Sequence, residues 1–336
     1  MTKPATSHQT LDEAGEFAES VPHEKLARSR AAQAVLWVVL IAAVLLAPAV
    51  LYPVFVMQLL CFALFACAFN LLIGFTGLLS FGHAAFFGGA AYICGHVVKV
   101  WGLPPLVGIL AGGVFAAALG YVVGSLAIRR QGIYFAMITL ALAQIVYFLA
   151  LQLPFTGGEN GLQGIPRGTL FGLFDLNDPL PMYYFVAAIF LAGFLIIYRT
   201  IHSPFGQVLQ AIRENEPRAR SLGYNVDRFK LIAFVLSASL AGVAGSTKAI
   251  VFQFASLTDA HWQMSGEVIL MTLIGGMGTI FGPVVGSVVI ITLQHYLADI
   301  GSWVQVVIGA IFIVSVLLFR RGVVGELARM LKISSV

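Results

Sequence analysis

Long apolar segments, separated by short polar ones, run along most of the chain. A bilayer core about 30 Å thick needs roughly 20 helical residues to cross it. Several segments approach this length with almost no charge: residues 34–52, 54–74, 104–127, 132–153, 182–199, 230–252 and 302–319. The pattern therefore predicts a bundle of membrane-spanning helices.

Two further apolar regions are interrupted by glycine. Residues 76–99 can form one broken span, whereas residues 262–299 are long enough for two spans, 262–276 and 280–299, separated at GGMGTIFGP. Irregular backbone at membrane depth is tolerated only where it is buried in protein or lines a polar cavity. Both regions are therefore candidates for a transport route, and the total becomes ten spans.

Basic residues test this count, because cytoplasmic loops are enriched in Lys and Arg. With an N-terminus inside and ten spans, every basic cluster lies in the cytoplasm. The clusters are Lys25, Arg28 and Arg30 before the first span, Arg129 and Arg130 after the fourth, the loop 200–229 after the sixth, and Arg320 and Arg321 after the tenth. Nine spans would place the last pair outside.

We therefore expect an all-α polytopic membrane protein of about ten transmembrane helices, with both termini in the cytoplasm. Two five-span halves would insert with opposite orientation, because five is odd. The transmembrane domain covers 34–322 and contains an outer loop at 154–181. Residues 1–33 are polar and lack the apolar segment of a signal peptide, so we expect a disordered cytoplasmic tail, with room for a short surface helix near the membrane. Residues 323–336 are expected to form a second cytoplasmic tail.

Composition agrees with this fold class. The 336 residues are 59% hydrophobic and 10% charged, whereas a soluble domain carries about 25% charge. Cys61, Cys67 and Cys94 lie in apolar runs without metal-ligand spacing, so we expect them to be small buried side chains and predict no metal site.

The cytoplasmic loop has a sequence of its own. Ser203 and Pro204 are typical of a helix start, and Phe205, Val208, Leu209 and Ile212 then follow at helical spacing. Asn215 is expected to cap a second short helix, and Gly223 to end it. We expect two capped helices, apolar on one side and basic on the other. The alternative is an ordinary solvated loop.

Motifs for chemistry are missing from the sequence. None of the six lysines follows the glycines of a phosphate-binding loop, and no zinc-protease or dinucleotide-binding motif occurs. The chain is therefore expected not to be an enzyme and to hold no cofactor. A pump built from it needs energy from a partner, and the charged loop is where that partner can act.

Four stretches carry a resemblance to a known family. GLLSFGHAAFFGGAAY (77–92), the segment 203–245 and GGMGTIFGPVVGS (275–287) resemble the permeases of branched-chain amino-acid ABC importers. TGGENGLQGIP (156–166) looks like the outer loop of the longer, M-type permease of the Liv system. The similarity covers roughly residues 35 to 325, and the segment 203–245 is its most specific part.

The resemblance implies partners and a location. They are two cytoplasmic ABC ATPase subunits, which bind the ATP, a paralogous H-type permease, and a periplasmic binding protein that delivers leucine, isoleucine or valine across the cell inner membrane. The loop would be the coupling element that docks on the ATPase. Residues implied for that contact are Ala211, Arg213, Glu214, Asn215, Glu216, Ala219 and Gly223.

The sequence also offers candidate residues for the translocation pathway and for contact with the binding protein. Candidates for the translocation pathway are Ser80, Gly82, His83, Gly88, Gly89, Gln144, Gly275, Gly276 and Gly278. Candidates for contact with the binding protein are Glu159, Asn160, Asp175 and Asp178. His83 can instead bond backbone freed by a broken helix, and Asn70 and Gln144 can be interhelical hydrogen-bond partners.

Other functions remain as alternatives. Related permeases carry urea, short amides or simple sugars, and the chain could form a pair with itself or with a paralogue. A stand-alone carrier or channel would not need the charged loop and is expected to show buried ionisable groups. A membrane enzyme or a nucleic-acid-binding protein has no support in the sequence.

Overall fold

The computed structural model describes residues 23–170, 174–298, 301, 303–318, 322 and 324–326. Its long or apolar helices are α2 His23–Val50, α3 Pro53–Thr76, α4 His83–Lys99, α5 Pro105–Ala127, α6 Ile133–Gln152, α7 Pro179–Ile201, α10 Val226–Phe252, α11 Trp262–Gly275, α12 Gly282–Tyr296 and α13 Trp303–Leu318. Two short helices, α8 Pro204–Glu214 and α9 Glu216–Ser221, form the cytoplasmic loop of the prediction. The described chain is thus mostly helical, as expected.

A few short elements join the helices. They are the 3₁₀ turns η1 Pro154–Thr156, η2 Gly158–Asn160 and η3 Leu257–Ala260, and the strands β1 Leu162–Gln163, β2 Thr169–Leu170, β3 Phe174–Asp175 and β4 Phe254–Ala255. Strand β1 pairs antiparallel with β4, and β2 with β3. The sequence predicted none of these strands, because two-residue pairings carry no periodicity of their own.

The long helices begin where proline allows a start and end where the backbone turns. Pro53, Pro105 and Pro179 occupy the first turns of α3, α5 and α7, where the missing N–H costs no helical hydrogen bond. Helix α3 ends at Gly77, which has a φ of +76°. The next helix starts only at His83, so the predicted break in residues 76–99 lies before His83.

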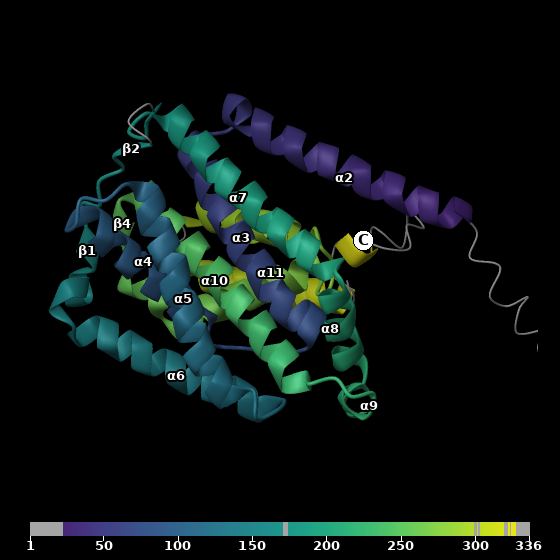
Figure 1. Ribbon diagram of the computed structural model, residues 1–336. Helices are drawn as coiled ribbons and strands as arrows, with labels where there is room; N and C mark the ends of the chain where they lie inside the picture. The colour runs from purple at the N-terminus through teal and green to yellow at the C-terminus, as the bar shows by residue number, and fades with distance from the viewer. Residues whose placement is uncertain are drawn as a thin grey trace, which may run out of the picture.

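Helices α3 and α10 form the centre of the bundle (Figure 1). Helix α10 packs on α3, α4 and α5, and α3 also packs on α7, α11 and α12. Small residues allow close approach: a Cβ added at Gly120 of α5 would lie 2.6 Å from the Ala238 Cβ of α10. Packing of this kind is common between membrane helices, which lack a hydrophobic force to hold them together.

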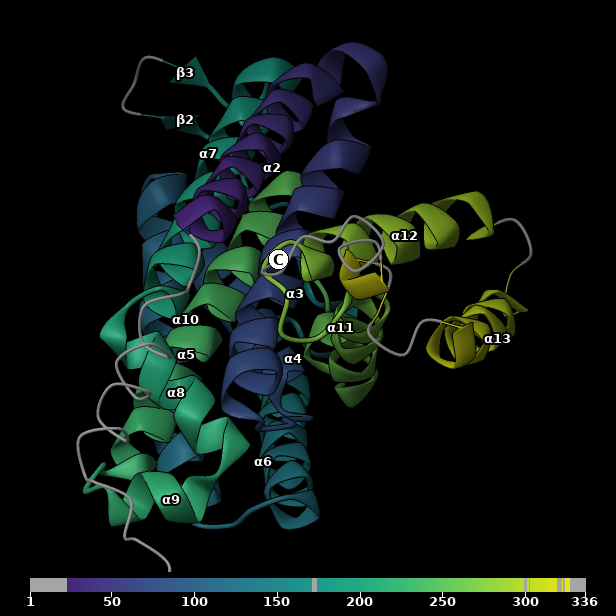
Figure 2. The same ribbon diagram turned by 90° about the vertical axis from the view of Figure 1, so that its right-hand side faces the viewer.

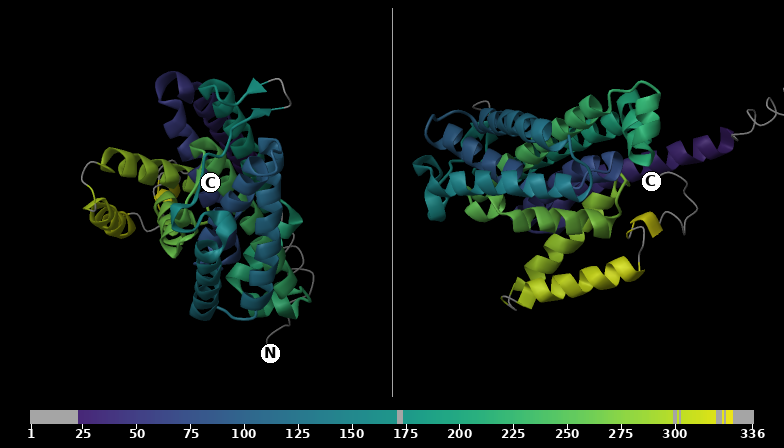
Figure 3. Two further views of the ribbon diagram at one scale, coloured as in Figure 1. Left: turned by 90° about the vertical axis from the view of Figure 1, so that its left-hand side faces the viewer. Right: turned by 90° about the horizontal axis from the view of Figure 1, so that it is seen from below.

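Helices α12 and α13 project from one side of the bundle (Figures 2 and 3). The chain breaks after Gly275 and resumes helix at Gly282, as the sequence GGMGTIFGP predicted. Helix α12 runs across the long axis of α3 and α10 (Figure 2). Helix α13 packs on α11 and α12.

Five helices are long and apolar enough to cross a membrane, namely α3, α5, α6, α7 and α10. Helix α4 has 17 residues, and α11, α12 and α13 have 14, 15 and 16. At 1.5 Å per residue these three measure only about 21–24 Å. The protein is therefore a multi-pass membrane protein, and the count of ten spans stays a prediction.

Helix α2 extends beyond the first predicted span. It begins at His23, so residues 23–33 of the predicted tail are helical, which agrees with the expected helix near the membrane. Eight of the eleven residues of this segment are Ala, Arg, Lys, Leu or Gln, which favour helix. Residues 1–22, the pair Arg320 and Arg321, and most of the tail 323–336 lie outside the described residues.

Candidate functional site

The two-helix segment between Ser203 and Asn225, here called the insert, is capped as predicted. The Ser203 hydroxyl accepts a hydrogen bond from the Gly206 N–H at 3.3 Å. The Asn215 side chain accepts one from the Arg218 N–H at 3.0 Å and starts α9. Gly223 follows α9 with a φ of +89°, in the left-handed region that favours glycine. Local sequence therefore builds both helices.

The insert has a small core. Ile212 of α8, Ala219 of α9 and Val226 of α10 are each 2% exposed and form one cluster, with Val208 and Phe229 packed against it. The predicted apolar stripe on α8 is thus confirmed as its inner face. Burial also places Ala219 away from any partner surface, although the resemblance had assigned it to the ATPase contact.

Glu216 connects three parts of the chain. Its Oε2 lies 2.5 Å from the Lys230 Nζ of α10, and its Oε1 accepts hydrogen bonds from Arg220 at 3.0 Å and from the Gln131 side chain at 2.9 Å. The Lys230 side chain is only 5% exposed. Glu216 therefore anchors α9 to α10 and to the loop between α5 and α6.

The outer surface of the insert combines charge with exposed apolar groups. Ala211, Glu214, Asn215 and Gly223 are exposed, as a docking surface requires. Two large apolar side chains beside Gly223 were not among the residues predicted for the contact: Leu222 is 69% exposed and Tyr224 is 42% exposed. Their signal was present, because both lie next to a helix-ending glycine and outside the inner apolar stripe.

Arg213 points back into the membrane domain. Its Nη1 donates a hydrogen bond to the Gly74 carbonyl near the end of α3. A Cβ added at Gly278, in the break between α11 and α12, would lie 3.1 Å from the same nitrogen. The guanidinium thus lies against both the end of α3 and the α11–α12 break.

Asn70 completes this polar contact. Its Oδ1 accepts a hydrogen bond from the Gly278 N–H at 3.0 Å, and its Nδ2 donates one to the Thr279 carbonyl at 2.8 Å. Asn70 was predicted to bond a neighbouring helix, and it bonds instead the non-helical backbone between α11 and α12. We call Asn70, Gly74, Arg213, Gly278 and Thr279 the polar network; it joins the insert, α3 and the break.

His83 lies fully buried at the start of α4. Its Nε2 is 2.9 Å from the Ser237 hydroxyl of α10, which in turn donates to the Ala68 carbonyl of α3 at 2.6 Å. The expected partner was freed backbone, and the structure supplies a serine side chain instead. His83 therefore holds α3, α4 and α10 together.

The predicted pathway residues are tightly packed within this subunit. Ser80, Gly82, Gly88, Gly89, Gly275 and Gly276 are buried, and Gln144 and Gly278 are half-buried. A Cβ at Gly88 would lie 2.5 Å from the Ala260 N, and one at Gly89 would lie 3.1 Å from the Phe115 ring. Helix α4 is continuous through this pair, so neither glycine breaks it. Close packing explains these glycines, and a pathway role stays a prediction.

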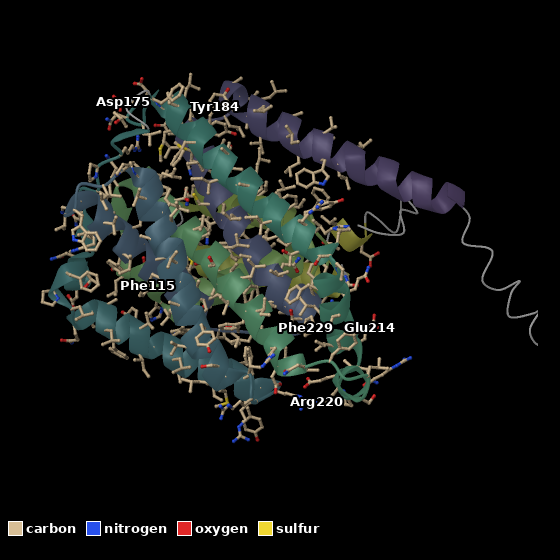
Figure 4. All side chains as sticks on the ribbon, in the orientation of Figure 1. Phe115, Asp175, Tyr184, Glu214, Arg220 and Phe229 are labelled. Atoms are coloured by element: carbon tan, nitrogen blue, oxygen red, sulfur yellow. The ribbon has the colours of Figure 1, made fainter. Side chains whose placement is uncertain are left out.

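The outer loop lies at the opposite end of the bundle from the insert. Figure 4 shows Asp175 at one end and Glu214 and Arg220 at the other. Glu159, Asn160, Asp175 and Asp178 are all exposed. The loop is held by the β1–β4 pairing and by Arg167, whose guanidinium donates to the Val251 carbonyl at 2.7 Å.

The described residues contain no group of three His, Cys, Asp or Glu side chains able to hold a metal ion. Cys61, Cys67 and Cys94 are free and buried, as predicted.

Comparison with known proteins gives a consistent result. The family described as branched-chain amino acid transport system, permease component, matches residues 54–316. No solved structure matches the chain.

Individual relatives are permeases. The chain is 29% identical over 289 residues to the high-affinity branched-chain amino acid transport system permease protein LivM of Salmonella typhimurium, covering 79% of this chain and 68% of the relative. The LivM protein of Escherichia coli is 28% identical over the same shares. The ribose import permease protein RbsC of Escherichia coli is 27% identical over 62% of this chain and 66% of the relative.

Proposed function

We infer the function from one premise: the chain belongs to the family of permease components of branched-chain amino acid transport systems. We propose that it is the transmembrane permease subunit of an ATP-driven importer that moves leucine, isoleucine and valine into the cytoplasm. The observation that carries this proposal is the family match, which runs from the second predicted span into the last. Its partners are two ABC ATPase subunits, a second permease and a periplasmic binding protein.

The insert is the proposed contact with the ATPase. Its capped helices rest on a small core, and exposed Leu222 and Tyr224 flank Gly223. An interface needs apolar groups that become buried on docking, surrounded by polar ones. Glu214 and Asn215 are also exposed on the insert and supply polar groups.

The proposed orientation has both termini and the insert in the cytoplasm, ten spans in the inner membrane and the outer loop in the periplasm. Bacterial relatives and the opposed positions of insert and outer loop support it (Figure 4). The acids Glu159, Asp175 and Asp178 are proposed to meet basic residues of the binding protein in a weak, salt-sensitive contact.

A sugar permease is the second candidate, because ribose import permeases are among the relatives. Their alignments cover 62–69% of this chain, against 79% for the LivM proteins. Coverage therefore favours branched-chain amino acids.

Uptake by intact cells tests the proposal. A strain deleted for this gene should lose high-affinity uptake of labelled leucine, isoleucine and valine, and the cloned gene should restore it. Labelled ribose and urea serve as comparison substrates in the same strains. Loss of ribose or urea uptake with normal leucine uptake would show that the chain serves one of the alternatives.

A further inference from the structure

One sizeable, partly open cavity of the described chain is lined by α11, α12 and α13. Its volume is about 620 Å³, within the range of about 300–1,000 Å³ typical of small-molecule sites. The space lies between the first half of α11 and the second half of α12, away from the α11–α12 break, and outside the residues that the sequence singled out for transport. We propose that it binds an amino acid with an apolar side chain, and that Glu267 accepts the ammonium group.

Glu267 is the ionisable side chain on the wall of this cavity. It forms no ion pair with any described residue, since the neighbouring cation Lys248 is bonded to Asp259. A carboxylate without an ion pair in an apolar membrane domain is costly, and such groups face a cavity or a pathway and mark function. A cation that enters the cavity would supply the missing partner.

The other walls match the rest of such a ligand. Leu270, Ile290, Val304 and Ile308 provide branched aliphatic surface, which suits a branched aliphatic side chain because its burial is favourable. The side-chain amides of Gln263 on α11 and Gln294 on α12 also line the cavity and can donate hydrogen bonds to a carboxylate. The Gln294 amide also donates a hydrogen bond to the Glu267 carboxylate.

The glycines of the cavity keep it open. A Cβ added at Gly266 or Gly309 would meet no atom within 4 Å, so each faces empty space. This differs from the packed glycines of α4 and of the α11–α12 break. The space is thus maintained by two helical positions that carry no side chain.

This inference rests on the proposed function and makes it more specific. Urea and simple sugars have no ammonium group, so a carboxylate without a cation partner gives them no comparable ion pair. An amino acid forms a charge-assisted hydrogen bond there, which is roughly twice as strong as a neutral one. Glu267 is therefore the proposed selectivity residue of the cavity.

Direct binding tests the site without the periplasmic binding protein. The full-length chain is purified with its co-expressed transporter subunits in lipid nanodiscs, and binding of labelled leucine is measured by equilibrium dialysis. Glu267→Gln should weaken binding about 10- to 100-fold, and Glu267→Asp less. The competitor 4-methylpentanoate, which lacks the ammonium group, should displace leucine about tenfold more weakly than unlabelled leucine does.

A matched pair on α13 controls for folding. Val304 lines the cavity, whereas Val306 is 58% exposed and lies outside the lining. Val304→Phe should abolish leucine binding, and Val306→Phe should leave it unchanged, with both complexes eluting as the wild type does. Equal effects of the two valine variants, or equal competition by 4-methylpentanoate, would overturn the site.

Transport assays distinguish failure of the cavity proposal from failure of the proposed function. If the wild-type complex imports leucine and Glu267→Gln imports it with unchanged KM, the cavity proposal is wrong and the proposed function stands. If the wild-type complex neither binds nor imports any branched-chain amino acid, the proposed function itself fails.

Discussion

Two acids of the insert, two positions apart, have different surroundings. The Glu216 side chain is 16% exposed and contacts Lys230, Arg220 and Gln131, whereas Glu214 is exposed at the end of α8. A buried ammonium that loses its carboxylate is left uncompensated, which is more costly than losing an exposed ion pair. Glu216 therefore stabilises the fold, and Glu214 is available to a partner.

Substitution separates these two roles. Glu216→Gln should lower the free energy of unfolding by about 2–4 kcal/mol, less than for a fully buried pair because Glu216 keeps some solvent contact. Glu214→Arg should leave thermal stability unchanged and abolish co-purification of the ATPase. Melting followed by size-exclusion chromatography checks the first effect, and a pull-down checks the second. Equal melting temperatures for Glu216→Gln and the wild type would contradict the anchoring role.

At the scale of elements, the end of α3, the α11–α12 break and α8 meet in the polar network. Asn70 satisfies one N–H and one C=O of the broken backbone, at Gly278 and Thr279. Arg213 extends the contact to the insert through the Gly74 carbonyl. A movement of the insert would therefore shift the backbone of the break through these hydrogen bonds. Helices α11 and α12, which flank the break, also line the cavity.

Asn70→Leu tests this connection. The change keeps a similar volume but leaves the Gly278 N–H and the Thr279 carbonyl unpaired, at about 1–3 kcal/mol for each group. ATPase retention should persist, because the surface of the insert is unchanged, while leucine transport falls steeply. Asn70→Asp, which keeps an acceptor for Gly278, should give an intermediate loss. Wild-type transport by Asn70→Leu would show that the network does not connect insert and break.

The sequence predicted the helices better than the contacts between them. The two helices of the insert could be predicted from Ser203, Asn215 and Gly223, because capping depends on neighbouring residues alone. By contrast, the bond from Asn70 to Thr279 joins residues 209 positions apart, and the one from His83 to Ser237 joins residues 154 positions apart. Such contacts depend on how helices pack, which no local pattern specifies. The same limit hid the cavity on α11, α12 and α13.

At the scale of the whole molecule, charge and shape agree on an orientation. The insert and the outer loop lie at opposite ends of a bundle of apolar helices (Figure 4). Basic residues gather in the insert, as they do in cytoplasmic loops. We therefore expect Asn160 to face the periplasm and Ala211 to face the cytoplasm.

Cysteine labelling tests that orientation. The three native cysteines are buried, so a single cysteine introduced at exposed Asn160 or Ala211 is the accessible thiol of the described residues. In intact spheroplasts a membrane-impermeant maleimide should label Asn160→Cys and spare Ala211→Cys, and inside-out vesicles should give the reverse. Labelling of both positions from one side would contradict the topology.

Reconstitution tests the central claim most directly. The permease and its co-expressed partner subunits are reconstituted into proteoliposomes. The binding protein and labelled leucine are added on the periplasmic side, and ATP is supplied on the side of the ATPase. The account predicts concentrative uptake of leucine that requires both ATP and the binding protein and is competed by isoleucine and valine but not by ribose or urea. Leucine movement that proceeds without ATP, or ATP-driven uptake of ribose in its place, would contradict the account.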